Sequence, residues 1–186
     1  MVVSLAGPAP VDPLALRAAT EHADTGSAAK RVTAAAARRQ VRAWRESGKR
    51  VGFTNGCFDL LHPGHLALLE GARRCCDRLV VAVNGDASVR RLKGSGRPVQ
   101  GLSERMALLS ALRSADLVVS FDEDTPERLI RQLCPDVLVK GADYRGKALP
   151  GADFVVGRGG EVVLVPLLRG HGTTSTIKRT ASKNSP

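Results

Sequence analysis

The stretch NGCFDLLHPGH at residues 55–65 joins a β-branched run to the start of a helical pattern. Within it, His62 and His65 flank a Pro-Gly pair at the position where a helix should begin. Two imidazoles and several unpaired backbone N–H groups can therefore face the same volume. Helix N-termini of this kind bind phosphate groups. The stretch predicts a strand, a phosphate-binding connection and a helix, in that order.

Short apolar runs alternate with helix-length segments on both sides of this stretch. We expect strands at Val51–Thr54, Leu79–Asn84, Leu117–Phe121, Val137–Lys140 and Glu161–Val165, and helices over Gly64–Cys75, Ser103–Leu112 and Pro126–Leu133. Residues 79–83 are apolar at successive positions, which is typical of a parallel strand covered on both faces. The predicted fold class is therefore α/β, a single-domain Rossmann-like parallel five-stranded sheet with helices on both faces. Its ligand site should lie beyond the carboxyl ends of the strands.

The chain has 186 residues, of which 43% are hydrophobic and 25% charged, so its composition excludes disorder of the whole chain. We expect a flexible extension at 1–29, a basic helix at 30–49, the folded domain at 50–180 and a polar tail at 181–186. No apolar run reaches the roughly 20 residues that cross a bilayer, and prolines interrupt the first thirteen residues. We therefore expect no membrane partner and a cytoplasmic location. The four cysteines have no zinc-site spacing, so we expect reduced thiols.

The formal net charge is +10, which makes an anionic partner the first hypothesis. Eight basic residues and one acid fall within residues 30–50. This segment is interpreted either as the solvated face of an amphipathic helix or as a contact with nucleic acid or a membrane. Aromatic residues make up 3% of the chain and offer few stacking platforms, so nucleic acid is the less favoured partner.

Two further segments carry candidate phosphate-binding chemistry. Residues 84–98 combine glycines with four basic side chains, a composition suited to gripping phosphates, although a solvated surface loop has the same composition. Residues 170–179 place hydroxyls before a short helical pattern, where they either cap the helix or gather around a phosphate. The chain contains neither a GxxxxGK[ST] phosphate loop nor a complete GxGxxG fingerprint after a strand, so a kinase or a dehydrogenase has little support.

The string GCFDLLHPGH resembles the HxGH signature, in its longer form GxFDxxHxGH, of the cytidylyltransferase-like nucleotidyltransferase superfamily. This resemblance implies that His62 and His65 donate hydrogen bonds to a triphosphate and stabilise charge as the bond to pyrophosphate breaks. Phe58 and Asp59 match the superfamily's Phe-Asp pair, in which the Asp helps to shape the acceptor side of the pocket.

The basic loop is similar to the family's RLKG…RP loop, which implies that Lys93 is a mobile cation bridging the phosphates of two substrates. Arg105 resembles the arginine of the helix that follows, with a structural role as the alternative. Residues 170–179 resemble the superfamily's second signature, with Thr173, Thr174 and Arg179 on matching positions and Gly172 in place of the usual first Ser.

The segments PDVLVKGADY at 135–144, LKG at 92–94 and FDEDTPERLI at 121–130 are similar to those of heptose-phosphate adenylyltransferases. The resemblance implies transfer of AMP from ATP to D-glycero-β-D-manno-heptose 1-phosphate, giving ADP-heptose and pyrophosphate. The alternatives are a cytidylyltransferase acting on glycerol phosphate or another alcohol phosphate, and a basic nucleic-acid-binding module.

The expected site follows from the resemblance. The catalytic candidates are His62, His65 and Lys93. The nucleotide-binding candidates are Gly56, Phe58, His62, His65, Lys140, Gly141, Asp143, Thr173, Thr174 and Arg179. The substrate-binding candidates are Asp59, Asn84, Lys93 and Arg105. No cluster of side chains has metal-ligand spacing, so Mg²⁺ should arrive with ATP rather than be held by the protein alone. The expected partners are ATP, a sugar 1-phosphate and a second copy of the chain in a homodimer.

Overall fold

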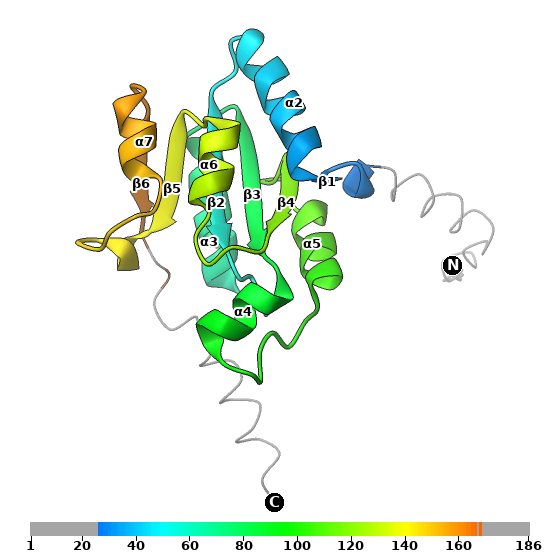
Figure 1. Cartoon of the computed structure of the whole chain (residues 1–186). Coiled ribbons are helices and arrows are strands. Elements are labelled where there is room, and N and C mark those ends of the chain that lie inside the picture. The colour runs from blue at the N-terminus through cyan, green and yellow to red at the C-terminus, as the bar shows by residue number, and fades with distance from the viewer. Residues whose placement is uncertain (1–25, 167, 169–186) are drawn as a thin grey trace, which may run out of the picture.

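A computed structural model describes residues 26–166 and 168 of the chain, and these form an α/β fold around one parallel sheet (Figure 1). The sheet has six strands in the order β1-β4-β3-β2-β5-β6, and every pairing is parallel. The strands are β1 (Arg31–Val32), β2 (Val51–Gly56), β3 (Arg78–Asn84), β4 (Leu117–Phe121), β5 (Val137–Gly141) and β6 (Glu161–Val165).

Five of these strands lie where the sequence predicts them, and β1 is the addition to the predicted five-stranded sheet. It is a two-residue edge strand in which Arg31 and Val32 pair with Val118 and Val119 of β4. Two residues are too few to produce a periodic signal, and their extended conformation comes from pairing with a distant strand. The basic helix therefore begins after residue 33 rather than at residue 30.

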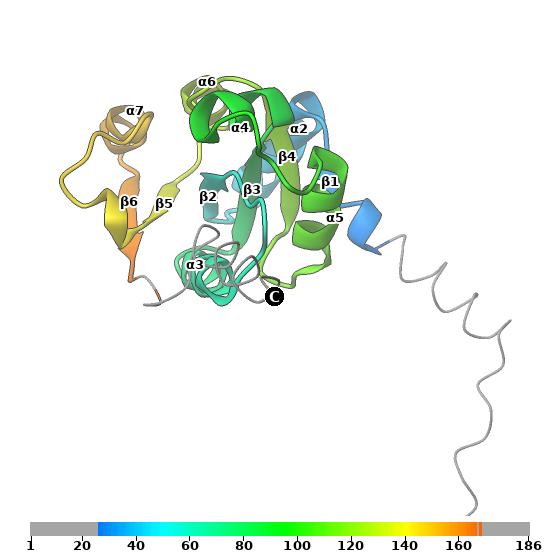
Figure 2. The same cartoon turned by 90° about the horizontal axis from the view of Figure 1, so that it is seen from below.

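Helices cover both faces of the sheet (Figure 2). They are α2 (Ala34–Glu46), α3 (Pro63–Arg74), α4 (Asp86–Lys93), α5 (Leu102–Ala111), α6 (Glu127–Leu133) and α7 (Ala152–Gly157), with a short 3₁₀ helix η1 (Ala142–Tyr144) after β5. One apolar cluster joins the sheet to α2, α6 and α7, and a second joins its other face to α3 and α5. The predicted two-sided covering is thus confirmed.

Strand β3 shows why the apolar runs are continuous. Val80 and Ala82 belong to the cluster beneath α2 and α6, whereas Leu79, Val81 and Val83 belong to the cluster beneath α3 and α5. Because successive side chains point to opposite faces, a strand buried on both sides needs an apolar residue at each position.

Helix α2 separates its apolar and charged residues in the same way. Ala37 and Val41 are fully buried against the sheet, while Arg38, Arg39 and Arg42 are exposed. The Thr33 side chain caps the helix by accepting a hydrogen bond from Ala36 N at 3.3 Å. The solvated-face interpretation of the basic segment accounts for this pattern of burial.

The direction of the crossovers reverses beside β2. From β2 the chain passes to β3 on one side, and it later returns to place β5 on the other side. The carboxyl ends of β2 and β5 therefore form the crevice in which ligands bind in open parallel sheets. Helix α4 lies beyond the carboxyl ends of the strands and borders this region (Figure 1).

Candidate active site

A cleft of about 680 Å³ opens at the carboxyl ends of β2 and β5. It is lined by the ends of β2, β3 and β5, the loop after β2, the start of α3, the end of α4 and the loop after it, the residues just before α6, and the segment after β5. The structure brings nine of the predicted site residues together there: Gly56, Phe58, Asp59, His62, His65, Asn84, Lys93, Lys140 and Asp143. They come from four separate parts of the sequence, residues 56–65, 84, 93 and 140–143, which the fold brings together.

The remaining candidates lie elsewhere. Gly141 is buried at the end of β5, behind the lining. Arg105 is fully buried and does not line the cleft. Thr173, Thr174 and Arg179 lie outside the described residues.

The two histidines form a stacked pair at the N-terminus of α3. His62 is the N-cap residue in an extended conformation, and Pro63 follows at the first helical position, where its missing N–H costs nothing. The two rings lie 3.8 Å apart between centroids, with an interplanar angle of 23°. The Phe58 ring lies 5.2 Å from the His65 ring, and the left-handed backbone at Phe58 (φ 47°) turns the chain between β2 and α3.

Burial makes His65 a neutral donor at physiological pH. Desolvation, reinforced by the neighbouring His62, lowers the pKa of His65 to about 4, while a backbone contact with Leu60 acts in the opposite direction. A neutral imidazole carries one N–H donor and one acceptor nitrogen, so the ring can form hydrogen bonds without itself being charged.

Lys140 brings a positive charge to the wall formed by β5. Its side chain reaches across to β2, where Nζ donates to Asn55 O at 3.1 Å, and it lies 5.0 Å from the centroid of the Tyr144 ring. The residue is 7% exposed, and burial lowers its pKa to about 8 against the opposing effect of Asp143. Among the described carboxylates, none lies within ion-pair distance of Nζ. An anionic ligand would supply the missing counter-charge.

The pKa of the Cys57 thiol reflects the positive charges around the cleft. Burial raises the pKa of its thiol, and the positive charges of Lys93, Arg105 and Arg97 act in the opposite direction. The thiol therefore stays protonated and is not an activated nucleophile, while the cations around it make the cleft attractive to anions. All four cysteines are free, as the reduced-thiol interpretation requires.

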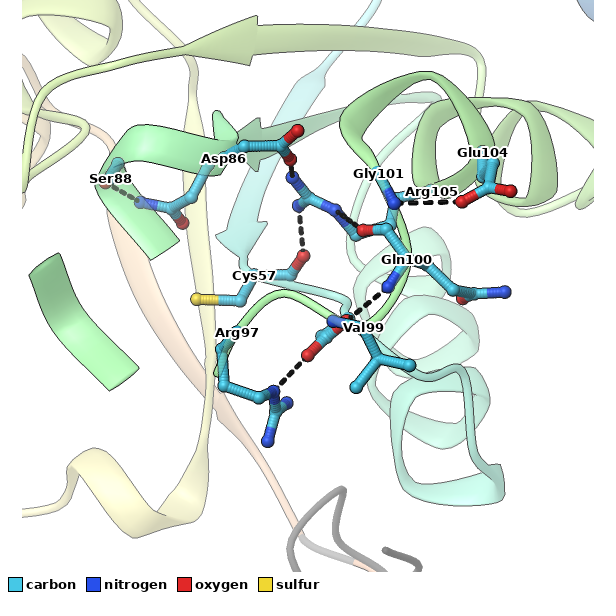
Figure 3. A network of polar contacts seen from close by, with 11 residues as sticks. Cys57, Asp86, Ser88, Arg97, Val99, Gln100, Gly101, Glu104 and Arg105 are labelled. Atoms are coloured by element: carbon cyan, nitrogen blue, oxygen red, sulfur yellow. Dashed lines mark hydrogen bonds and ion pairs between the residues drawn. The ribbon is translucent and has the colours of Figure 1, made fainter. Parts of the chain in front are cut away.

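Two residues predicted to contact substrate hold the loop at residues 94–101 in place (Figure 3). Asp59 is 1% exposed, and its Oδ1 accepts hydrogen bonds from Val99 N at 2.7 Å and Gln100 N at 3.0 Å. Arg105 donates to Cys57 O at 2.5 Å, Gln100 O at 3.0 Å and Asp86 Oδ1 at 2.7 Å. The expectation of a substrate contact by Arg105 is thus corrected, because its charged group is sealed within the protein and bonded on three sides.

Asn84 also has an internal partner. It is 3% exposed, and its Nδ2 donates to Ser88 Oγ at 3.0 Å. Ser88 in turn donates to Glu123 O at 3.1 Å. These bonds fix the first turn of α4 against the end of β3 and the segment after β4.

The structure also shows which of the four basic residues in the loop region face the cleft. Lys93 and Arg97 line it, whereas Arg90 does not. Arg91 pairs with Asp124 at 2.7 Å, and Asp124 itself lies in the wall. Sequence reasoning did not select Arg97, because four neighbouring cations give the same compositional signal.

Sequence reasoning also missed Tyr144 and Asp124, which line the cleft, although Tyr144 belongs to the VKGADY string.

In the part of the chain that the structure describes, no three His, Cys, Asp or Glu side chains could hold a metal ion together. A search of the same residues for a helix long and apolar enough to span a membrane finds none.

Residues 53–163 match the family model described as cytidylyltransferase-like. Curated relatives named "Bifunctional protein HldE" are similar over most of this chain. The one from Gluconacetobacter diazotrophicus is 60% identical over 145 residues, which cover 78% of this chain and 30% of that protein. The one from Rhodospirillum rubrum is 52% identical over 180 residues, covering 96% of this chain and 36% of that protein. The chain thus spans about a third of the length of these relatives.

Two solved structures have similar folds. A lipopolysaccharide core biosynthesis protein from Thermoplasma volcanium aligns with a TM-score of 0.55 and 26% identity, covering 67% of this chain and all of that one. A pantoate-β-alanine ligase from Francisella tularensis aligns with a TM-score of 0.51 and 16% identity, covering 76% of this chain and 70% of that one. The second likeness concerns the fold alone.

Proposed function

This chain belongs to the cytidylyltransferase-like family, and from that premise we propose that it transfers AMP from ATP to D-glycero-β-D-manno-heptose 1-phosphate, giving ADP-heptose and pyrophosphate. The observation that carries the proposal is the stacked pair of His62 and His65 at a helix N-terminus, inside a cleft that Lys93 and Lys140 also line. Such a site suits a substrate with several phosphate groups.

The reaction needs little proton chemistry. A phosphate monoester has its second pKa near about 6, so the sugar phosphate is mostly dianionic at neutral pH and needs no general base. One of its oxygens forms a bond to the α-phosphorus of ATP, and the bond from that phosphorus to the bridging oxygen of the β-phosphate breaks. The electron pair leaves with pyrophosphate.

Catalysis then depends on position and charge. Two anions must approach each other while negative charge grows on the leaving pyrophosphate, so fixed donors and cations lower the barrier. His62 and His65 would donate to the triphosphate, and Lys93, at the exposed end of α4, would bridge the phosphates of the two substrates. Thr173, Thr174 and Arg179 are proposed to contact the triphosphate as well.

The nucleotide would lie against Gly56, Phe58, Lys140 and Asp143, which all line the cleft. We propose that Mg²⁺ is held by the triphosphate and by water, which matches the hard oxygen ligands that this ion prefers and would neutralise phosphate charge. We further propose a cytoplasmic location, where ATP and sugar phosphates are present, and a homodimeric assembly.

The choice of a heptose phosphate rests on the segment after β5. Within PDVLVKGADY, the residues Lys140, Asp143 and Tyr144 all lie in the cleft wall, where they can influence which substrate fits. The relatives named HldE, which match this chain at 52–60% identity, support the same choice.

The test is to mix the purified protein with the heptose 1-phosphate, ATP and Mg²⁺ and to follow pyrophosphate release. The expected result is rapid release that a His62→Ala His65→Ala double variant lacks. A competition between ATP and CTP identifies the nucleotide. Preference for CTP together with glycerol phosphate would establish the alternative, a cytidylyltransferase acting on an alcohol phosphate. Equal release by the protein and the double variant would refute nucleotidyl transfer at this site.

A further inference from the structure

Arg97 enters the cleft from the loop between α4 and α5. Its side chain is 18% exposed, and its Nε donates to Asp59 Oδ2. Among the described residues, no acceptor lies within hydrogen-bonding distance of its two terminal amino groups. These groups point away from the polar network that holds the loop (Figure 3). One edge of the guanidinium is thus fixed, and the other is available to a ligand.

The two oxygens of Asp59 perform different tasks. Oδ1 accepts from the backbone N–H groups of Val99 and Gln100, which holds the loop in place. Oδ2 accepts from Arg97 and so sets the direction of the guanidinium. The carboxylate is almost completely buried, so a charge-assisted pair here is screened little by water.

Arg105 fixes the same part of the loop from the opposite side. It donates to Gln100 O, while Asp59 accepts from Gln100 N, so this residue is held through both of its backbone polar groups. Arg105 also bonds Cys57 O beside β2 and Asp86 at the start of α4. Arg97 is therefore carried by a loop anchored to three surrounding elements.

The surroundings of Arg97 favour an anion. Arg97 and Lys93 line the same cleft as Cys57, so two cations face one cavity. A planar guanidinium with two available amino groups matches a phosphate in a bidentate arrangement. A lysine at this position would offer a point charge instead.

We propose that Arg97 binds a phosphate group in the cleft and that Asp59 is its positioning residue; the proposal rests on the function proposed above. The phosphate comes from ATP or from the sugar phosphate, and the kinetic arms of the experiment distinguish these two sources.

The experiment compares Arg97→Ala, Arg97→Lys and Asp59→Asn with Arg90→Ala, a matched control. Arg90 is an exposed arginine of α4 that does not line the cleft. Arg97→Ala should lower kcat/KM about 10- to 100-fold, the range for losing a hydrogen bond to a charged group. A raised KM for ATP assigns the phosphate to the nucleotide, and a raised KM for the sugar phosphate assigns it to the acceptor. Arg97→Lys keeps the charge and should recover only part of the loss.

Asp59→Asn isolates the positioning step. An asparagine can keep its oxygen on the two backbone N–H groups, but its amide nitrogen then faces Arg97 Nε, donor against donor. The loop stays anchored while the arginine is released. We expect a loss of about 10-fold in kcat/KM from this change alone, and less than about 2-fold when it is added to Arg97→Ala. An Asp59→Asn effect of equal size in both backgrounds would overturn the positioning role.

A binding measurement separates this proposal from the proposed function. Calorimetric titration of the protein with pyrophosphate, and separately with inorganic phosphate, should give an affinity that Arg97→Ala lowers about 10-fold or more for at least one anion. If the protein makes no nucleotide sugar but still shows this loss, the proposed function fails and the role of Arg97 stands. If Arg97→Ala matches Arg90→Ala in anion affinity and in both kinetic constants, the role of Arg97 is refuted.

Discussion

The imidazole rings of His62 and His65 stack 3.8 Å apart at the first turn of α3. The helix itself produces this arrangement, because residues three apart lie on the same side of a turn, and the backbone N–H of His65 donates to His62 O at 2.9 Å. The two rings are thus held side by side before a ligand arrives. A preorganised pair of this kind stabilises developing charge without a cost of reorganisation during the reaction.

Replacing either histidine should therefore slow the reaction. We expect His62→Ala or His65→Ala to lower kcat by about 10²–10³, or roughly 2.7–4 kcal/mol, as for other preorganised donors. Because the two rings act as a unit, the double variant should lose less than the sum of the single losses in free energy. Steady-state pyrophosphate release measures the effect, with Arg90→Ala as the control. A single-variant loss below about 3-fold would contradict the role.

The buried His65 also predicts how stability depends on pH. Its pKa is lowered to about 4 in the fold, against about 6.5 in an unfolded chain. Between these values the unfolded chain binds the proton more readily, so stability rises with pH across this window and is lost as pH falls. Urea unfolding at pH 4.5 and 7.0 should show that His65→Gln reduces this pH-dependent loss by about 1–3 kcal/mol. An unchanged loss would show that His65 does not titrate in this way.

Lys140 should contribute to ATP binding but add little to the stability of the fold. Burial lowers its pKa from 10.5 to about 8, a penalty of about 3 kcal/mol at neutral pH. Its hydrogen bond to Asn55 O offsets about 1–3 kcal/mol of that penalty. Lys140→Met removes the remaining cost, so it should raise the free energy of unfolding by between 0 and about 2 kcal/mol while weakening ATP binding about 10-fold. A strongly destabilised variant with intact ATP affinity would reverse this assignment.

Replacing Gly71 of α3 even by alanine should lower the free energy of unfolding. A Cβ there would lie 2.6 Å from Val165 Cγ1 and 2.9 Å from its Cγ2. Alanine gains up to about 1 kcal/mol of helix propensity, but overpacking costs about 1–3 kcal/mol. Gly71→Ala should therefore destabilise the protein by about 1–2 kcal/mol in urea unfolding.

Gly157 of α7 is the matched control, because a Cβ there would have no heavy atom within 4 Å. Gly157→Ala should stabilise the protein by about 0.5–1 kcal/mol. Equal effects of the two substitutions would mean that α3 does not pack closely on β6.

The parts of the fold that the sequence predicts are those with local signals. Continuous β-branched runs predicted five strands because both faces of the sheet are covered. Helix α4 was not predicted. Its eight residues, DASVRRLK, bury only Ser88 and Val89, so the segment lacks a helical apolar pattern and has the composition of a basic loop. Strand β1 depends on β4 for its conformation and has no pattern of its own.

In the candidate site, too, local features were predictable from the sequence and features that depend on distant residues were not. The histidine pair is visible in the sequence because both residues belong to one turn. The roles of Asp59 and Arg105 depend on partners about 40 to 48 residues away. Contacts at this separation produce no periodic pattern in the sequence. The choice of Arg97 and Lys93 among four neighbouring cations depends on which side of α4 and its loop faces the cleft.

The most direct test of adenylyl transfer follows the α-phosphorus of ATP. The protein is incubated with the heptose 1-phosphate, Mg²⁺ and ATP radiolabelled at that atom, and the products are separated by chromatography. The account predicts that the label appears in the nucleotide sugar and that an equal amount of unlabelled pyrophosphate is formed. Label that remains in ATP, or that is recovered as ADP or AMP without a sugar adduct, would contradict it.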